Sequence, residues 1–126
     1  MRLLSTRIHG VLDFLVGALM IIMPWLFGFT IGGAETWVPV IMGALVIVYS
    51  LMTDYEAGSV SILAMPQHLA FDAASGIFLA VSPWLFGFAS VVWVPHVVLG
   101  FLSLVVAATT RSDGARPVDE PGSNRD

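Results

Sequence analysis

The sequence predicts an all-α membrane protein with four transmembrane helices, built from two tandem two-helix repeats. Of its 126 residues, 57% are hydrophobic and only 11% are charged, whereas roughly a quarter of the residues of a soluble domain are charged. No Asp, Glu, Lys or Arg occurs in residues 14–34 or in residues 73–110. Because roughly 20 apolar residues cross a bilayer core as a helix, the second stretch is long enough for two spans.

The second half of the chain repeats the first. Residues 9–29 and 68–88 align without a gap: His, Asp and Gly fall at matching places, and both segments end in Pro-Trp-Leu-Phe-Gly-Phe. The segments that follow also match, with one residue inserted. Trp37-Val38-Pro39 answers Trp93-Val94-Pro95, Gly43 answers Gly100, and Thr53 answers Thr110. Self-similarity of this kind indicates one structural unit used twice, here a helix, an aromatic turn and a second helix.

The four helices are expected at about residues 8–26, 38–52, 67–85 and 94–109. Pro39, Pro66 and Pro95 fall in or near the first turn of three of them, where the N–H that proline lacks would be unpaired in any case. Pro24 and Pro83 are expected to kink or end the first and third helices, because a residue that precedes proline disfavours α geometry.

The chain divides into five parts on this basis. Residues 1–7 form an N-terminal cytoplasmic segment, 8–53 the first repeat, 54–66 a cytoplasmic or interfacial connection, 67–110 the second repeat and 111–126 a tail. The tail is rich in Pro, Gly, Asp and Arg and has nothing to bury, so it is expected to be disordered.

Arginine predicts the orientation. The basic residues all lie toward the two ends of the chain, and the two outer turns have none, so the positive-inside rule places both termini in the cytoplasm. Two termini on one side agree with an even number of spans. The tryptophans flank the outer turns, where an interfacial aromatic belt would lie. These basic residues and tryptophans are Arg2, Arg7, Arg111, Arg116, Arg125, Trp25, Trp37, Trp84 and Trp93.

An alternative interpretation makes residues 1–34 a cleaved signal peptide, with Arg2 and Arg7 as its basic region. The repeat argues against this, because the equivalent segment 68–88 is internal. The composition also limits the classes of function. The chain has no cysteine, which excludes disulfides and thiolate metal sites, and it has no basic patch, so nucleic acid is not an expected partner.

The Ser82-Pro83-Trp84 sequence, which follows Gly76 in an apolar segment, resembles the motif of the SPW-repeat family of small prokaryotic integral membrane proteins. The first half carries Met23-Pro24-Trp25 at the matching place, so serine is not required in both repeats. The resemblance covers residues 8–110. It implies the repeated membrane fold and a multi-pass location in a prokaryotic plasma membrane, and it implies no particular activity.

Four ionisable residues repeat inside the predicted spans. His9 and Asp13 are four positions apart and therefore share one face of a helix, and His68 and Asp72 do the same. Because a parallel repeat places both pairs at one depth, two imidazoles and two carboxylates are expected to meet near the cytoplasmic side. Glycines on these helices would let neighbouring helices approach closely. The expected packing glycines are Gly17, Gly43, Gly76 and Gly100.

Three interpretations of this polar cluster remain open. The residues pair structurally, each His with its own Asp or with the Asp of the other repeat. Alternatively they form a proton or ion pathway, since intramembrane ionisable groups are costly and often functional. As a third possibility they bind a divalent metal, since two His and two carboxylates are a ligand set for Zn or Fe. No motif of the HExxH kind is present, no catalytic residue is assigned, and no cofactor besides a divalent metal is expected.

Two further features have both a structural and a functional interpretation. His96, at the start of the fourth helix, is expected to place its polar tip at the headgroup level, with an outer gate or ligand as the alternative. The aromatic turns are expected to end helices and anchor them in the interface, with a lipid or quinone surface as the alternative.

Three functions follow from these interpretations. The expected one is a non-enzymatic structural or assembly component of a membrane, in contact with lipid and with a second copy or a membrane-complex partner. It is favoured because the second and fourth helices offer few polar residues to line a pore. The alternatives are a small oligomeric proton- or ion-coupled transporter that uses the polar cluster, and a metal- or quinone-dependent membrane enzyme.

Overall fold

The computed structural model describes residues 4–53 and 63–110. In these residues it has four α-helices and two isolated β-bridges but no strand. The helices are α1 (Thr6–Leu26), α2 (Ala34–Leu51), α3 (Met65–Leu85) and α4 (Val94–Thr109). The predicted tail 111–126, most of the connection 54–66 and residues 1–3 of the N-terminal segment lie outside the described residues.

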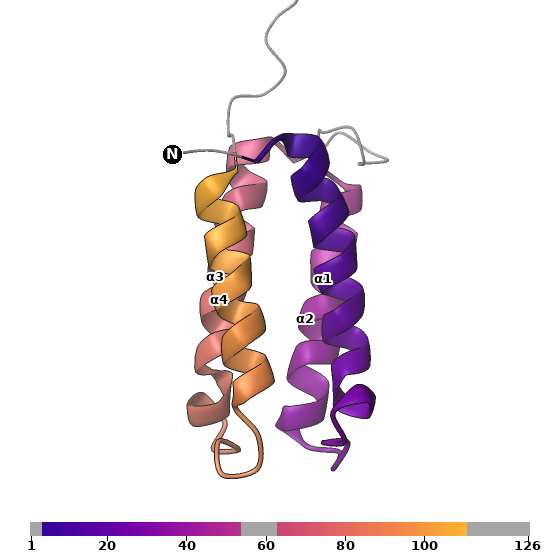
Figure 1. Cartoon of the computed structure of the whole chain (residues 1–126), viewed down its shortest axis with the longest axis vertical. Coiled ribbons are helices and arrows are strands. Elements are labelled where there is room, and N and C mark those ends of the chain that lie inside the picture. The colour runs from indigo at the N-terminus through magenta and orange to yellow at the C-terminus, as the bar shows by residue number, and fades with distance from the viewer. Residues whose placement is uncertain (1–3, 54–62, 111–126) are drawn as a thin grey trace, which may run out of the picture.

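The helices form two antiparallel hairpins that stand side by side (Figure 1). One hairpin is α1 with α2, and the other is α3 with α4. The two aromatic turns, residues 27–33 and 86–93, lie together at one end of the unit, which we call the turn end. The described ends of the chain lie at the opposite end, where Leu4 forms a bridge with Thr110, and Thr53 forms one with Leu63.

Glycine allows the helices of each hairpin to touch. A Cβ atom added at Gly43 would lie 2.5 Å from the carbonyl oxygen of Gly17, and one added at Gly76 would lie 2.7 Å from the carbonyl oxygen of Gly100. Both distances are shorter than real Cβ contacts. The expected packing glycines therefore pair within the hairpins, Gly17 with Gly43 and Gly76 with Gly100, where backbone meets backbone.

The surface is apolar, as the composition predicts for a membrane protein. Three helices are long and apolar enough to cross a bilayer: α1, α2 and α3. The fourth, α4, is equally apolar but has 16 residues, about 24 Å of helix against a hydrocarbon core of about 30 Å. Large side chains such as Leu15 and Phe101 point outward and are 62% and 65% exposed. The acidic side chains of the described residues, Asp13, Glu35 and Asp72, are instead buried.

Each aromatic turn is a helix cap built on the proline. The amide of Phe88 donates to the carbonyl of Pro83 over 2.7 Å, around Gly87, which has a φ of +74°. The amide of Phe29 donates in the same way to Pro24, around Gly28. This is the Schellman arrangement, in which a left-handed glycine ends the helix and satisfies its last carbonyls. Pro24 and Pro83 thus lie in the last turn of α1 and of α3, two residues before each helix ends.

Serine in the Ser-Pro-Trp motif has a separate task. Pro83 has no N–H, so the helix cannot supply a donor to the carbonyl four residues earlier, which is that of Leu79. The hydroxyl of Ser82 donates to this carbonyl over 2.7 Å. The motif thus combines a proline that interrupts the helix with a serine that satisfies the carbonyl the proline leaves free. In the first repeat, Met23 stands in place of this serine.

The start of α2 differs from the prediction. The helix begins at Ala34 rather than near residue 38, because Glu35 and Thr36 organise the preceding turn. The Glu35 carboxylate accepts from the amide of Gly33 over 2.8 Å, and the Thr36 hydroxyl donates to the carbonyl of Phe29 over 3.0 Å. Pro39 therefore lies inside the helix rather than in its first turn, and its missing N–H leaves the carbonyl of Glu35 without an intrahelical donor.

Candidate functional site

The four ionisable residues meet in the interior. His9 and Asp13 come from the first two turns of α1, and His68 and Asp72 come from the first two turns of α3. Both histidines have 0% exposure, and the two aspartates are buried. One ligating atom from each residue lies within 4.8 Å of all the others. We call these four residues the His–Asp cluster and their end of the unit the cluster end.

Each histidine makes its shorter contact with the aspartate of the other hairpin. His9 Nε2 lies 2.7 Å from Asp72 Oδ2, and His68 Nε2 lies 2.7 Å from Asp13 Oδ2. The contacts within each helix are longer, 3.1 Å for His9 with Asp13 and 3.2 Å for His68 with Asp72. Of the structural pairings considered from the sequence, the crossed one has the shorter contacts. The cluster is therefore a link between hairpins.

Two threonines orient the imidazoles. Thr110 Oγ1 lies 2.7 Å from His9 Nδ1, and Thr53 Oγ1 lies 2.6 Å from His68 Nδ1. Each hydroxyl also donates to a backbone carbonyl over 2.6 Å, Thr110 to Val106 and Thr53 to Tyr49. Since a hydroxyl has one hydrogen, its oxygen must accept from the imidazole. Both Nδ1 atoms therefore carry the N–H, and both Nε2 atoms point at the carboxylates.

Hydroxyl groups of α2 donate hydrogen bonds to both carboxylates, and the bond to Asp72 is much shorter than the bond to Asp13. The Tyr49 hydroxyl donates to Asp72 Oδ1 over 2.5 Å, and the Ser50 hydroxyl donates to Asp13 Oδ2 over 3.3 Å. In α4, Val106 and Ala107 occupy the matching positions. The sequence argument that α2 offers few polar residues overlooked this pair of side chains, which reach the centre of the cluster.

Little free volume adjoins the cluster. A cavity of about 10 Å³ touches Asp13, Tyr49, Asp72 and Ser103, which is the size of a single water molecule at most. The cluster therefore has four converging metal-ligand atoms and almost no room for a substrate. Its geometry allows it to hold one metal ion or to pair histidines with aspartates.

The interior beyond the cluster is apolar. The core that connects the cluster end to the turn end consists of fully buried methionine and leucine side chains packed against valine and phenylalanine. Among the described residues, this core carries no ionisable group between the His–Asp cluster and His96. Its buried members are Met20, Met23, Phe29, Val46, Leu79 and Leu99.

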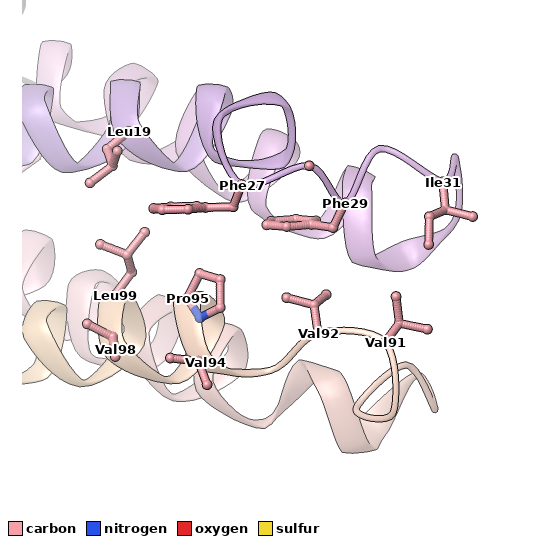
Figure 2. Close-up of a pocket in the computed structure, with 11 residues that line it drawn as sticks. Leu19, Phe27, Phe29, Ile31, Val91, Val92, Val94, Pro95, Val98 and Leu99 are labelled. Atoms are coloured by element: carbon pink, nitrogen blue, oxygen red, sulfur yellow. The ribbon is translucent and has the colours of Figure 1, made fainter.

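The turn end holds the larger cavity, about 580 Å³, between the first turn and the start of α4 (Figure 2). Phe27 and Phe29 lie on one side, and Val92, Pro95 and Leu99 lie on the other. Every lining side chain is apolar, so the cavity suits hydrocarbon. It offers no side-chain donor to orient a quinone carbonyl, and small-molecule sites normally include a few such polar groups.

His96 is buried at the turn end rather than placed at a headgroup surface, which corrects the expectation for this residue. Its exposure is 0%, and its ring packs between those of Phe29 and Phe88. Its Nε2 lies 3.2 Å from the carbonyl oxygen of Glu35, the carbonyl that Pro39 leaves free. Because a carbonyl only accepts, Nε2 is the donor. His96 thus supplies across the hairpins the hydrogen bond that proline removes.

Four site residues were missed by sequence reasoning: Tyr49, Ser50, Thr53 and Thr110. A signal for the threonines existed, because Thr53 and Thr110 coincide in the repeat and follow the helices that run back toward His9 and His68. Tyr49 has no counterpart in the second repeat, so the repeat could not reveal it. Tyrosine is also common at membrane interfaces, so its presence near the end of the second helix did not mark it as part of a buried site.

The fold and this interior define a helical protein of the membrane class, since apolar helices enclose buried charges. A family model described as the SPW repeat domain matches residues 7–110. The chain belongs to this family, as its two Pro-Trp motifs predict. Neither the curated proteins nor the solved structures include a match to the chain. The three long apolar helices and the family together support an integral membrane location.

Proposed function

We propose that the chain is a non-enzymatic structural component of a membrane, in which the His–Asp cluster fixes two hairpins as one rigid unit. The observation that carries this proposal is the crossed pairing: both 2.7 Å contacts join one hairpin to the other. Each hairpin is already tightly packed through its glycines. The buried polar residues, in contrast, fix how the two hairpins associate with each other.

The surroundings of the cluster favour this function over the alternatives. A transporter needs a path for its ion, yet the described core between the two ends is apolar. An enzyme needs space for a substrate, yet the cavity at the cluster has about 10 Å³. A rigid unit with outward apolar faces, in contrast, is suited to contact with lipid. One of these faces can instead contact a second copy or a membrane partner.

Spin labels test whether the cluster fixes the hairpins. The chain has no cysteine, so cysteines can be introduced in pairs at exposed sites and labelled. Labels at Leu15 in α1 and Phe101 in α4 report the distance between hairpins, and labels at Leu15 and Leu45 report the distance within one. We expect Asp13→Asn with Asp72→Asn to broaden the first distance distribution and to leave the second narrow. Broadening of neither would show that the cluster does not join the hairpins.

A flux assay tests the transporter alternative on the same protein. We expect proteoliposomes that contain the purified chain to conduct neither protons nor divalent ions. Flux that requires Asp13 and Asp72, in a variant that keeps its helical content, would overturn the structural proposal in favour of transport.

We also propose that both termini face the cytoplasm, in a prokaryotic plasma membrane, with the cluster end inward. The support is the distribution of arginine together with the common end that Leu4 and Thr110 share. Labelling of a cysteine at position 32 in the first turn by an impermeant reagent, in intact cells, tests this orientation. Protection of that cysteine until the cells are lysed would reverse it.

A further inference from the structure

We propose that the His–Asp cluster is a binding site for one divalent transition-metal ion of the zinc type, ligated by Nε2 of His9 and His68 and by Oδ2 of Asp13 and Asp72. This goes beyond the structural role proposed above, because charge pairing alone would also join the hairpins. The two proposals are therefore tested by different measurements.

The first argument is the spacing of the four ligand atoms. The two Nε2 atoms are 3.3 Å apart, and the four distances from Nε2 to Oδ2 range from 2.7 to 3.2 Å. Ligands at about 2.0–2.1 Å from a tetrahedral zinc ion lie about 3.3 Å from one another. The five distances are equal to this value or somewhat shorter. All four atoms lie within 4.8 Å of one another, so the shell forms around a central ion if the Nε2 atoms move outward and the two carboxylates take up the same spacing.

The second argument is the orientation of the histidines. Histidine ligands of metals almost always donate their second ring N–H to an oxygen, which fixes the tautomer and the plane of the ring. Thr110 and Thr53 accept from Nδ1 of His9 and His68 in this way. Each threonine is in turn anchored by its bond to a backbone carbonyl. The Nε2 atoms of both rings therefore face the carboxylates of the cluster and carry the lone pairs that a metal would use.

The third argument is charge. In the neutral tautomer, two Nε2 lone pairs and two carboxylates face one another in a buried space, and this arrangement needs positive charge. One divalent ion balances the two carboxylates and accepts both lone pairs. Protons on both histidines would balance the charge too, since each ring lies 2.7–3.2 Å from both carboxylates, so uptake of metal by the folded chain is the measurement that distinguishes the ion from the protons.

The donor set indicates the class of ion. Two imidazoles and two carboxylates suit zinc, ferrous iron or cobalt, whereas magnesium and calcium prefer six or more oxygen ligands. Tyr49 holds Asp72 through Oδ1 and leaves Oδ2 for the metal. Because the four ligands fill the shell and the adjoining cavity is so small, the site is of the closed, structural kind rather than one with an open catalytic position.

Cobalt(II) is the probe for the experiment, because its visible spectrum reports both binding and tetrahedral geometry. The full chain, purified in detergent and stripped with a chelator, is titrated with cobalt and then with zinc. We expect about one cobalt per chain, the intense visible bands of a four-coordinate ion, and displacement by zinc. A folded wild-type chain that takes up no stoichiometric cobalt or zinc would overturn the proposal.

Three variants locate the ion. His68→Gln is expected to abolish stoichiometric binding. Thr53→Val, which removes only the partner of Nδ1, is expected to weaken binding about 10- to 100-fold. His96→Gln is the matched control, a buried histidine outside the cluster, and should leave binding unchanged. Binding that survives His68→Gln, or that His96→Gln abolishes, would assign the metal to another place and overturn the proposal.

The spin-label measurement separates this proposal from the structural one. If the stripped wild-type chain keeps a narrow distance distribution between hairpins and takes up no metal, the structural role stands and the metal site falls. If the distribution is broad in the stripped chain and narrows only when the chain takes up one ion, the metal site stands, and the ion rather than charge pairing alone joins the hairpins.

Discussion

The two ends of the unit join the same two hairpins by different means. At the cluster end, four buried ionisable side chains cross-pair, with threonine and tyrosine partners around them. At the turn end, the hairpins share apolar contacts, a cavity of about 580 Å³ and the hydrogen bond from His96 to the carbonyl of Glu35. Lipid chains are as apolar as the core, so apolar contacts alone give little reason for helices to associate in a bilayer. Specific association is therefore concentrated at the cluster end.

The largest expected effect comes from removing a cluster charge. Asp72→Asn withdraws the carboxylate that contacts His9, His68 and Tyr49. Breaking a buried charge pair by removing one partner typically costs about 3 kcal/mol or more. We expect a loss of about 3 kcal/mol in the free energy of unfolding, measured by SDS titration in mixed micelles.

Glu35→Gln is the control at the turn end. The Glu35 carboxylate accepts from the amide of Gly33 in its own turn, and an amide oxygen can accept the same bond. Its expected cost is below about 1 kcal/mol. Equal losses for Asp72→Asn and Glu35→Gln would contradict the contrast between the two ends.

This contrast was only partly predictable from the sequence. The repeat and the charge-free stretches predicted the helices, because apolar length and periodicity are local properties. They also predicted that His9, Asp13, His68 and Asp72 share an end. They could not predict the crossed pairing, since a spacing of four residues suits a bond within one helix equally well. Which aspartate lies closer depends on how the hairpins pack against each other.

The second expected effect is on packing within a hairpin. In α2, a side chain at Gly43 would enter the backbone of α1 at Gly17, so Gly43→Leu must push the helices apart. Overpacking of this kind costs about 1–3 kcal/mol, which should appear as a lower unfolding temperature. The neighbouring Ala44→Leu, on the exposed side of α2, introduces the same side chain and is the control. If both variants lose equal stability, close approach of the backbones is not what stabilises the hairpin.

A smaller effect is expected at the Ser-Pro-Trp motif. Ser82→Ala leaves the carbonyl of Leu79 without a donor, because Pro83 has no N–H to offer. An unsatisfied buried acceptor costs about 1–2 kcal/mol, measured as a shift in the unfolding midpoint. Ser103→Ala is the matched control: Ser103 donates to Leu99 over 3.0 Å, but that carbonyl lies in a regular helix. The proposed role of serine fails if the control variant loses as much stability as Ser82→Ala.

Proline also explains why the interpretation of His96 from the sequence was wrong. The start of α2 could not be located from propensity, since Gly32 and Gly33 suggest a loop while Glu35 and Thr36 reach back to extend the helix. With the start misplaced, Pro39 was expected in the first turn, where it would free no carbonyl. Only the longer helix creates an acceptor at Glu35, and only the packing of the hairpins brings His96 to it.

The smallest expected effect tests this link with a double-mutant cycle. His96→Leu leaves the Glu35 carbonyl without a donor and should cost about 1 kcal/mol. In a Pro39→Ala background, residue 39 regains an N–H that can bond to the same carbonyl within the helix. His96→Leu should then cost less, so that the two substitutions are non-additive by about 0.5–1 kcal/mol. Strict additivity would mean that His96 acts only through its contacts with Phe29 and Phe88, and the turn end would then join the hairpins by apolar packing alone.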